Sequence, residues 1–194
     1  MKDRQWAEIS ALMKNGGIGV IPTDTLYGLV GSALLPEAVE RIYRVRKRSP
    51  DKPFIVLISR IEDLNSFGII PDTFLKEFLA RNWPGKVSVI ISGIKDQWNY
   101  LHRGERSIAF RLPDKKALVG LISETGPLVA PSANPEGLPP ARTIEEARNY
   151  FGDSVDFYVN GGTLEGKPST LVRFNQGEYN VVRQGKSLIT PITP

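Results

Sequence analysis

The sequence predicts an α/β or α+β fold, in which helices flank a twisted mixed sheet of parallel and antiparallel strands. Segments with a helical period alternate with short β-branched runs along most of the chain. Several strand-like runs follow one another near the C-terminal end, which argues against a purely parallel sheet. The 194 residues are 41% hydrophobic and 24% charged, so we expect a single domain over residues 1–194.

The elements can be placed in order from local signals. Asp3 is a candidate cap for a first helix, which Gly16 and Gly17 end. A strand at 18–21 follows, Pro36 opens a second helix, and 54–58 is an apolar run typical of a buried strand. The other expected elements are helices at 74–83, 117–122 and 143–151, and strands at 86–92, 107–112, 127–131, 156–160, 169–174 and 179–183.

Composition excludes several kinds of site. The chain has no cysteine, so it has no thiolate nucleophile, disulfide or Cys-based zinc site. A Ser-His-Asp triad would need the single histidine, His102, which lies in a polar stretch and is expected at the surface. No run approaches ~18 apolar residues and the N-terminus lacks a signal pattern, so we expect a cytoplasmic protein. The net charge of +4 favours anionic partners.

Three small polar side chains end the first predicted strand. In "IPTDTLYGL" at 21–29, Thr23, Asp24 and Thr25 come directly after the strand. Ligands tend to bind at such strand ends in sheets flanked by helices. Threonine and aspartate also cap ordinary turns, and this stretch alone favours the turn.

A basic segment follows the second predicted helix. "RVRKRSPDKP" at 44–53 contains Arg46, Arg48 and Lys52 among its cations. The helix dipole favours cations at a helix end by ~0.3–1 kcal/mol each, which would explain a solvated basic end. If the chain is extended there, Arg46 and Arg48 lie on one side, and a phosphate between them would relieve their repulsion. Both explanations stay open.

Two later segments place short polar groups beside rigid loops. "APSANPEGLPPA" at 130–141 brings Ser132 and Asn134 to the end of a strand, before a proline-rich loop. Ser169 begins a strand in "GKPSTLVRF", and Arg183 ends another. Neither G-x-x-x-x-G-K-[ST] nor G-x-G-x-x-G is present. A bound nucleotide would therefore have to be held by side-chain cations and hydroxyls.

In this order, the four segments resemble the threonylcarbamoyl-adenylate synthase family, the YrdC/TsaC proteins. The likeness is carried by "PTDTLYGL", the basic element, a "PG" pair, "RLP", "SAN" and "ST", from about residue 16 to residue 185. It implies a YrdC-like fold with a concave basic pocket. The implied activity makes threonylcarbamoyl-AMP and pyrophosphate from ATP, bicarbonate and L-threonine, for threonylcarbamoyladenosine in tRNA.

The resemblance also implies roles for individual residues. Arg46 and Arg48 would be catalytic cations, and Mg²⁺ would accompany ATP; no residue is assigned as a metal ligand. The implied L-threonine contacts are Thr25, Arg111, Ala130 and Ser169. The implied ATP contacts are Arg48, Lys52, Ser107, Ser132, Asn134, Pro140 and Arg183. Two anions must meet in this reaction, so it needs a cationic pocket and good positioning more than a covalent nucleophile.

Three positions depart from the family pattern. Arg46 replaces a usual lysine, Leu57 stands where some members place a histidine near the threonine, and Glu136 replaces a common serine. These changes leave the preferred amino acid open. Longer members carry an extra C-terminal domain, so a chain ending at Pro194 is expected to be the single-domain form.

Two other functions compete with the enzyme. An RNA-binding module could use the same basic groove, and a pI of about 9.3 permits it, although no aromatic RNP element or GXXG loop is present. A carbamoyl-transfer domain acting without threonine normally carries zinc-binding cysteines, which are missing. If the chain is the enzyme, we expect a transferase that acts on tRNA as its downstream partner. We also expect weak binding of RNA and no association with a membrane.

Overall fold

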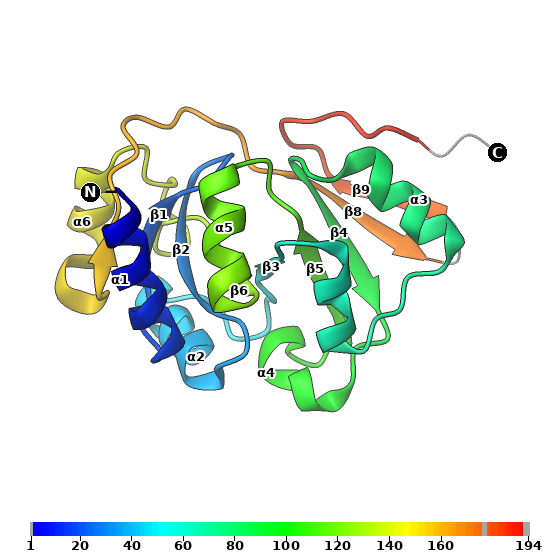
Figure 1. The fold of residues 1–194 in the computed structure, drawn as a ribbon, viewed down its shortest axis with the longest axis horizontal. Helices are drawn as coiled ribbons and strands as arrows, with labels where there is room; N and C mark the ends of the chain where they lie inside the picture. The colour runs from blue at the N-terminus through cyan, green and yellow to red at the C-terminus, as the bar shows by residue number, and fades with distance from the viewer. Residues whose placement is uncertain (1, 176–177, 192–194) are drawn as a thin grey trace.

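The computed structural model describes residues 2–175 and 178–191. Its strands form one mixed nine-stranded sheet in the order β7-β1-β2-β6-β3-β5-β4-β8-β9, with helices packed against it (Figure 1). The pairs β3–β5, β4–β8 and β1–β7 are parallel, and the others are antiparallel. The expected mixed sheet flanked by helices is therefore confirmed.

The elements have the following bounds. The strands that the structure describes are β1 (Gly19–Pro22), β2 (Tyr27–Ser32), β3 (Ile55–Leu57), β4 (Val87–Ser92), β5 (Ser107–Arg111), β6 (Leu128–Val129), β7 (Phe157–Tyr158), β8 (Thr170–Asn175) and β9 (Glu178–Arg183). The α-helices are α1 (Lys2–Lys14), α2 (Pro36–Arg46), α3 (Thr73–Asn82), α4 (Asn99–His102), α5 (Lys116–Thr125) and α6 (Ile144–Phe151). Short 3₁₀ helices are η1 (Ile61–Phe67), η2 (Asp96–Trp98) and η3 (Gly152–Ser154).

Two apolar clusters cover the two faces of the sheet. Val20 and Leu29 belong to the larger cluster, which includes residues of α2, α3 and α6. Their neighbours Ile21 and Val30 belong to the smaller one, with residues of α1 and α5. Because successive side chains of a strand point to opposite faces, the clusters lie on opposite sides of the sheet. Helices α1 and α5 lie side by side over the smaller cluster (Figure 1).

The second strand of the first hairpin is one element that the sequence did not predict. Strand β2 pairs antiparallel with β1 over the whole of β1, and every residue of β2 is buried. A Cβ added at Gly31 would lie 2.9 Å from Cγ2 of Ile18 and 3.1 Å from Cδ1 of Ile42. Glycine at this position therefore lets α2 pack closely on the sheet.

Helix α2 ends in a turn and not in an extended segment. Pro36 stands in its first turn, as predicted, and Ile42 faces the core. Lys47 then adopts a left-handed conformation, with φ of 51°, and the backbone N–H of Arg48 bonds to the carbonyl of Tyr43. The expectation that alternation places Arg46 and Arg48 on one side is therefore wrong in its geometry.

Three smaller expectations are also corrected. Asp3 lies within α1 and does not precede it. The helical period of this segment predicts that Leu12 shares the inward face of Ile9 and Met13, but Leu12 is 43% exposed. His102 is not a surface residue, since it is 1% exposed and its Nδ1 accepts hydrogen bonds from the backbone N–H groups of Gly104 and Arg106.

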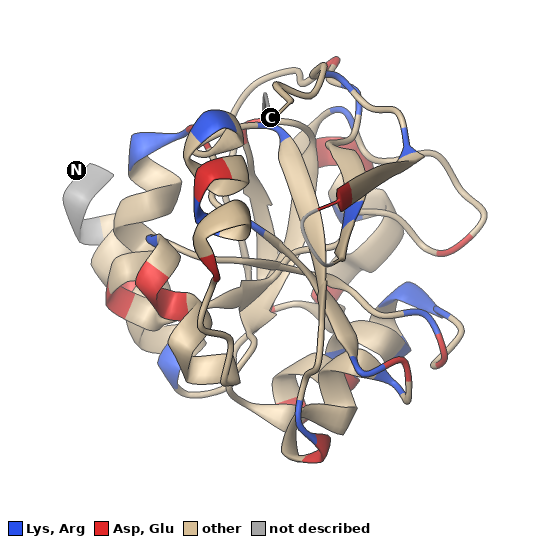
Figure 2. Ribbon diagram, turned by 90° about the vertical axis from the view of Figure 1, so that its right-hand side faces the viewer, with Lys and Arg blue, Asp and Glu red and all other residues tan. Residues whose placement is uncertain are grey.

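Two general properties of the described residues are their hydropathy and the distribution of their charges. Among residues 2–175 and 178–191, none of the helices is long and apolar enough to cross a bilayer. Acidic and basic residues are interspersed over the side shown in Figure 2.

Candidate active site

A pocket of about 350 Å³ opens on the sheet beside the region that α5 covers. Its floor follows one row across four strands, because Ile55 pairs with Ala109, Ala109 with Ile90, and Ile90 with Arg173. All four side chains line the pocket. Ile55 also packs against the α1–α5 cluster, so the pocket lies on that side of the sheet.

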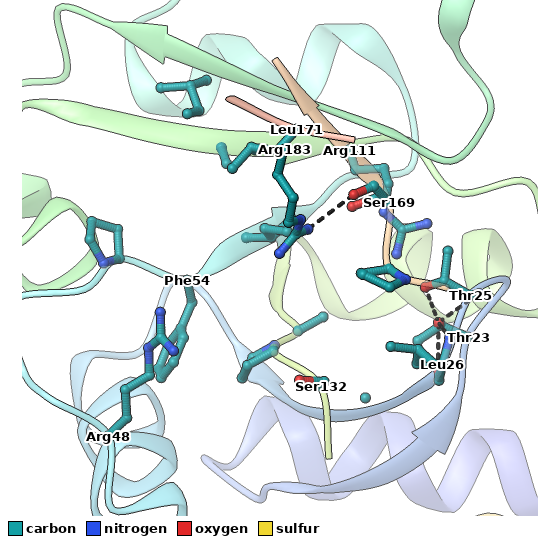
Figure 3. Close-up of a pocket in the computed structure, with 18 of the residues that line it drawn as sticks. Thr23, Thr25, Leu26, Arg48, Phe54, Arg111, Ser132, Ser169, Leu171 and Arg183 are labelled. Atoms are coloured by element: carbon teal, nitrogen blue, oxygen red, sulfur yellow. Dashed lines mark hydrogen bonds between the residues drawn. The ribbon is translucent and has the colours of Figure 1, made fainter. Parts of the chain in front are cut away.

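Most of the residues implied by the family resemblance meet in this pocket. The lining includes Thr25, Arg46, Arg48, Ser107, Arg111, Ala130, Ser132, Ser169 and Arg183. Figure 3 shows that those it labels come from separate segments, with Arg48 on the opposite side of the view from Thr25 and Arg111. Lys52, Asn134 and Pro140 are not in the lining. Five arginines are present in all, because Arg173 joins the four that the sequence suggested.

The β1–β2 turn fixes Thr25 through its neighbour Thr23. The Oγ1 of Thr23 donates to the Leu26 carbonyl at 2.6 Å and accepts from the backbone N–H of Thr25 at 3.1 Å. It also lies 3.1 Å from the Oγ1 of Thr25. Both threonines are nearly buried, at 5% and 9% exposed. Thr23 thus holds the turn, as threonine does in a side-chain-closed turn, and Thr25 contributes to the lining.

A buried ion pair connects this turn to β5. Arg111 donates from Nη1 to Oδ1 of Asp24, and their side chains are only 5% and 3% exposed. The Nζ of Lys115 donates to the Pro22 carbonyl at 2.9 Å, and burial lowers the pKa of this lysine. The Nε of Arg111 has no hydrogen-bond partner among the described residues. Asp24 therefore orients a guanidinium that retains bonding capacity at the pocket.

Arg46 and Asn134 form a second buried contact. The Nε and Nη2 of Arg46 donate to the main-chain carbonyl and to Oδ1 of Asn134, at 2.8 and 3.2 Å. Ser132 donates to the same Oδ1 at 2.7 Å. Arg46 is 4% exposed, and burial, followed by repulsion from Arg48, lowers its pKa to about 10. It stays charged at neutral pH, and Asn134 reaches the pocket only through Arg46 and Ser132.

Arg48 and Lys52 lie at the edge of the site. The guanidinium of Arg48 stands 5.5 Å from the centroid of the Phe54 ring, and that of Arg46 lies 5.9 Å from the same centroid. The turn after α2 therefore still brings both cations close to one aromatic ring. Lys52 is outside the lining, and its ammonium pairs with Glu136 at 2.9 Å.

Strands β8 and β9 form the remaining wall. The Oγ of Ser169, just before β8, lies 2.8 Å from the Oγ of Ser88, and Arg183 donates to the Ser169 carbonyl at 3.0 Å. Burial lowers the pKa of Arg183. Arg173 was not suggested by the sequence, although its alternation with Leu171 on β8 and with Ser169 just before β8 would have placed it on the same face.

Two of the departures from the family pattern lie outside the pocket lining. Leu57 is fully buried in the α1–α5 cluster and does not line the pocket. Glu136 contacts the basic segment at 48–52 and not Thr25. Neither residue therefore lines the pocket, although Leu57 is the strand partner of Arg111, which does.

Protein ligands for a metal ion are scarce. No group of three or more His, Cys, Asp or Glu side chains could hold a metal ion within residues 2–175 and 178–191. Among the described residues that line the pocket, Glu105 is the only carboxylate. With five arginines and one carboxylate among its described lining residues, the pocket suits an anionic ligand.

Comparison with known proteins adds sequence relatives. The Sua5_yciO_yrdC family model, described as "Telomere recombination", matches residues 11–185. A threonylcarbamoyl-AMP synthase of Marinobacter nauticus is 36% identical, covering 84% of this chain and 87% of the relative. One of Bacillus subtilis is 34% identical, covering 88% of this chain and 50% of the relative.

Solved structures of P. abyssi Sua5 have the same fold. A doubly substituted form has a TM-score of 0.89 at 24% identity, covering 96% of this chain and 58% of Sua5. A complex with L-threonine has a TM-score of 0.84 at 26% identity, covering 93% and 54%. This chain thus spans a little over half of Sua5. Together with the family match, these findings establish that the chain belongs to the Sua5/YciO/YrdC family.

Proposed function

We propose that this chain is a threonylcarbamoyl-AMP synthase, a nucleotidyltransferase that uses ATP, bicarbonate and L-threonine. The observation that carries the proposal is one pocket that joins Thr25, Arg111 and Ser169 to the cations Arg48 and Arg183. Two relatives at 34% and 36% identity carry this activity in their names, and the P. abyssi neighbour was solved with L-threonine. The product would be threonylcarbamoyl-AMP, with release of pyrophosphate.

L-Threonine would bind at the end of the pocket near the β1–β2 turn. Arg111, held by Asp24, would pair with the substrate carboxylate, since a planar guanidinium can bond both oxygens. The hydroxyls of Thr25 and Ser169 would bond the polar groups of the amino acid, and Ala130 would leave room beside them. This end is nearly buried before any ligand arrives, so little ordering is left for binding.

ATP would bind at the other end. Arg48 and Arg183 would contact its phosphates, and the hydroxyls of Ser107 and Ser132 would donate hydrogen bonds to the nucleotide. Asn134 would act by holding Arg46 and Ser132 in place. Lys52 and Pro140 lie outside the lining, so their contact with ATP requires the two loops that carry them to move inward.

The chemistry would proceed in two steps. The neutral amine of threonine attacks the carbon of bicarbonate, and loss of water leaves a carbamate. A carbamate oxygen then forms a bond to the α-phosphorus of ATP while the bond to the pyrophosphate oxygen breaks. Both reactants of the second step are anions, so the positive potential of Arg46 and Arg48 and close positioning lower its barrier. No protein nucleophile is required.

Magnesium would enter as part of the substrate. Because one carboxylate, Glu105, is found among the described lining residues, Mg²⁺ would be held chiefly by the ATP phosphates. The product is a mixed anhydride of a carbamate and a phosphate, and it would pass to a transferase that acts on tRNA. Such a reaction sequence would operate in the cytoplasm, where the transferase meets its tRNA substrate.

The proposal can be tested by replacing Arg48. Arg48→Ala is expected to lose most threonine-dependent pyrophosphate release while keeping its thermal unfolding midpoint, because this side chain lies at the edge of the pocket. Arg60→Ala is the matched control, since the side chain of Arg60 is 74% exposed and pairs with Asp63 on η1. Wild-type protein that releases no pyrophosphate in response to threonine, and binds RNA instead with steep salt dependence, would overturn the assignment.

A further inference from the structure

Glu136 joins the two segments that carry most of the proposed nucleotide contacts. Its Oε1 lies 2.9 Å from the Nζ of Lys52 and 3.9 Å from the Nη1 of Arg48. Its Oε2 accepts from the backbone N–H of Ser49 at 2.8 Å, and its own N–H donates to the Arg46 carbonyl at 2.8 Å. One carboxylate thus connects the 134–140 loop to the basic segment at 46–52.

The carboxylate of Glu136 is ionised under ordinary conditions. The hydrogen bond from Lys52, followed by that from the Ser49 N–H, lowers the pKa of Glu136 to about 2. At neutral pH it therefore places one full negative charge against the positive charges of Arg48 and Lys52. The local excess of positive charge available to an entering anion is reduced accordingly.

The donors around Glu136 are those that bind phosphate. An ammonium, a guanidinium and a backbone N–H converge on its two oxygens, which is the usual set for a phosphate group. The segment is compact, because the Lys52 carbonyl accepts from the hydroxyl of Tyr43 and from the Nε of Arg48. The cations of the segment are therefore held together in the conformation that Glu136 contacts.

The Glu136 contact is open to solvent, unlike the ion pair of Asp24 and Arg111. The side chains of Lys52 and Glu136 are 54% and 31% exposed, whereas those of Arg111 and Asp24 are 5% and 3% exposed. Exposed ion pairs contribute little net free energy and are screened by salt. Phosphate oxygens can therefore replace the carboxylate of Glu136 at small cost.

We propose that Glu136 is an internal competitor of the ATP phosphates, which holds Arg48 and Lys52 in the empty site and gives way when ATP binds. This inference rests on the proposed function, in which these cations contact ATP. Glu136 is then a positioning residue that touches no reacting atom and raises the KM for ATP. A carboxylate that only braced the two loops would have the opposite effect, because its loss would disorder the cations and raise the KM.

The sign of the change in KM separates these two roles. Glu136→Gln keeps the shape of the side chain and removes its charge, so it is expected to lower the KM for ATP by a factor of about two to five, the range typical of an exposed pair. The turnover number should change less. Glu77→Gln is the matched control, since it removes the same charge from an exposed pair on α3. Glu136→Asp, which retains the charge, should restore a KM near that of the wild type.

Salt provides the second readout. The advantage of Glu136→Gln should shrink between about 50 mM and 500 mM salt, because the Debye length falls from roughly 14 Å to roughly 4 Å and screens exposed charges more strongly. An unchanged or raised KM for ATP, in a variant whose unfolding midpoint matches the wild type, would overturn the proposal. A KM advantage that does not depend on salt would also overturn it.

Direct binding separates this inference from the proposed function. The Kd for ATP, measured by calorimetry without threonine or bicarbonate, should fall in Glu136→Gln by the same factor as the KM. If wild-type protein binds ATP but makes no adenylate, the proposed function fails while this comparison still decides the inference. If Glu136→Gln binds ATP no more tightly while the wild type is active, the inference alone fails.

Discussion

The two ends of the pocket are built in different ways. At the proposed threonine end, Thr23 is hydrogen-bonded to Thr25, and the buried side chain of Arg111 is paired with that of Asp24, before any ligand is present. At the proposed phosphate end, Lys52 and Glu136 form an ion pair that solvent reaches. The first end is fixed by burial, and the second is held by contacts that another anion can replace.

This difference suggests a division of tasks. A rigid amino-acid end discriminates small substrates, because unpaired polar groups in a buried site are costly. An adjustable phosphate end can accept a large charged substrate and release pyrophosphate without breaking the core. Substitutions at the first end should therefore affect both stability and threonine use, whereas those at the second should affect ATP binding alone.

The largest effect is expected from Asp24→Asn. Removing one charge of a buried pair leaves Arg111 uncompensated, so the free energy of unfolding should fall by about 3 kcal/mol or more. Threonine-dependent turnover should fall with it, because Arg111 loses its orientation. Urea denaturation and pyrophosphate release measure the two losses. Glu77→Gln, in the exposed pair on α3, should change stability by no more than about 0.5 kcal/mol.

The next largest effect is expected from Gly166→Ala. Gly166 lies in the segment before β8, where that segment contacts the β1–β2 turn. A Cβ at this position would overlap the carbonyl oxygen of Thr25, so Gly166→Ala must displace one of the two segments. A shift of about 1 Å in a positioning group can reduce rates by up to ~100-fold, so the KM for threonine should rise at least tenfold. The KM for ATP should change much less.

Gly120 offers a control for the added methyl group. A Cβ at Gly120 in α5 would meet no described atom within 4 Å, so Gly120→Ala should leave both KM values unchanged and raise stability by up to about 1 kcal/mol. Equal increases in the two KM values of Gly166→Ala would argue against separate ends. Steady-state kinetics with each substrate varied in turn supply the numbers.

The smallest effect is expected from Arg173→Ala. Arg173 lines the pocket on β8 but is exposed and has no hydrogen-bond or ion-pair partner among the described residues, so its loss disturbs no internal contact. ATP affinity should fall about two- to fivefold, as for one exposed charge, with no change in the unfolding midpoint. Calorimetric titration of ATP measures the first quantity and thermal unfolding the second. A change in threonine affinity larger than the change in ATP affinity would contradict the assignment of Arg173 to the phosphate end of the pocket.

Much of the fold could be predicted from local signals. The helix expected at 143–151 spans Ile144–Phe151, and the side chain of Thr143 caps it by accepting from the N–H of Glu146. Strand β2 was not predicted because Gly28 and Gly31 weaken its β-strand pattern. Gly31 is required by the close packing of α2 against the sheet. His102 was misplaced because its burial depends on tertiary packing that a polar stretch of sequence does not indicate.

The site was predictable as a set of residues but not as a set of contacts. Hydroxyls, an amide and arginines in a known order pointed to one pocket, and most of them line it. The pairing of Arg46 with Asn134 and of Lys52 with Glu136 joins positions 88 and 84 residues apart. Only the fold brings such residues together. From the sequence, Glu136 could be interpreted only as a residue affecting the preferred amino acid, whereas the structure shows that it contacts the basic segment.

The most direct test of the account is the product itself. Purified protein should be incubated with Mg²⁺, ATP, bicarbonate and each of several amino acids in turn, followed by mass detection of the adenylates formed. The account predicts a mass corresponding to threonylcarbamoyl-AMP with L-threonine, dependent on bicarbonate and lost in Arg48→Ala. Absence of any carbamoyl-adenylate with every amino acid, from folded protein that binds ATP, would contradict it.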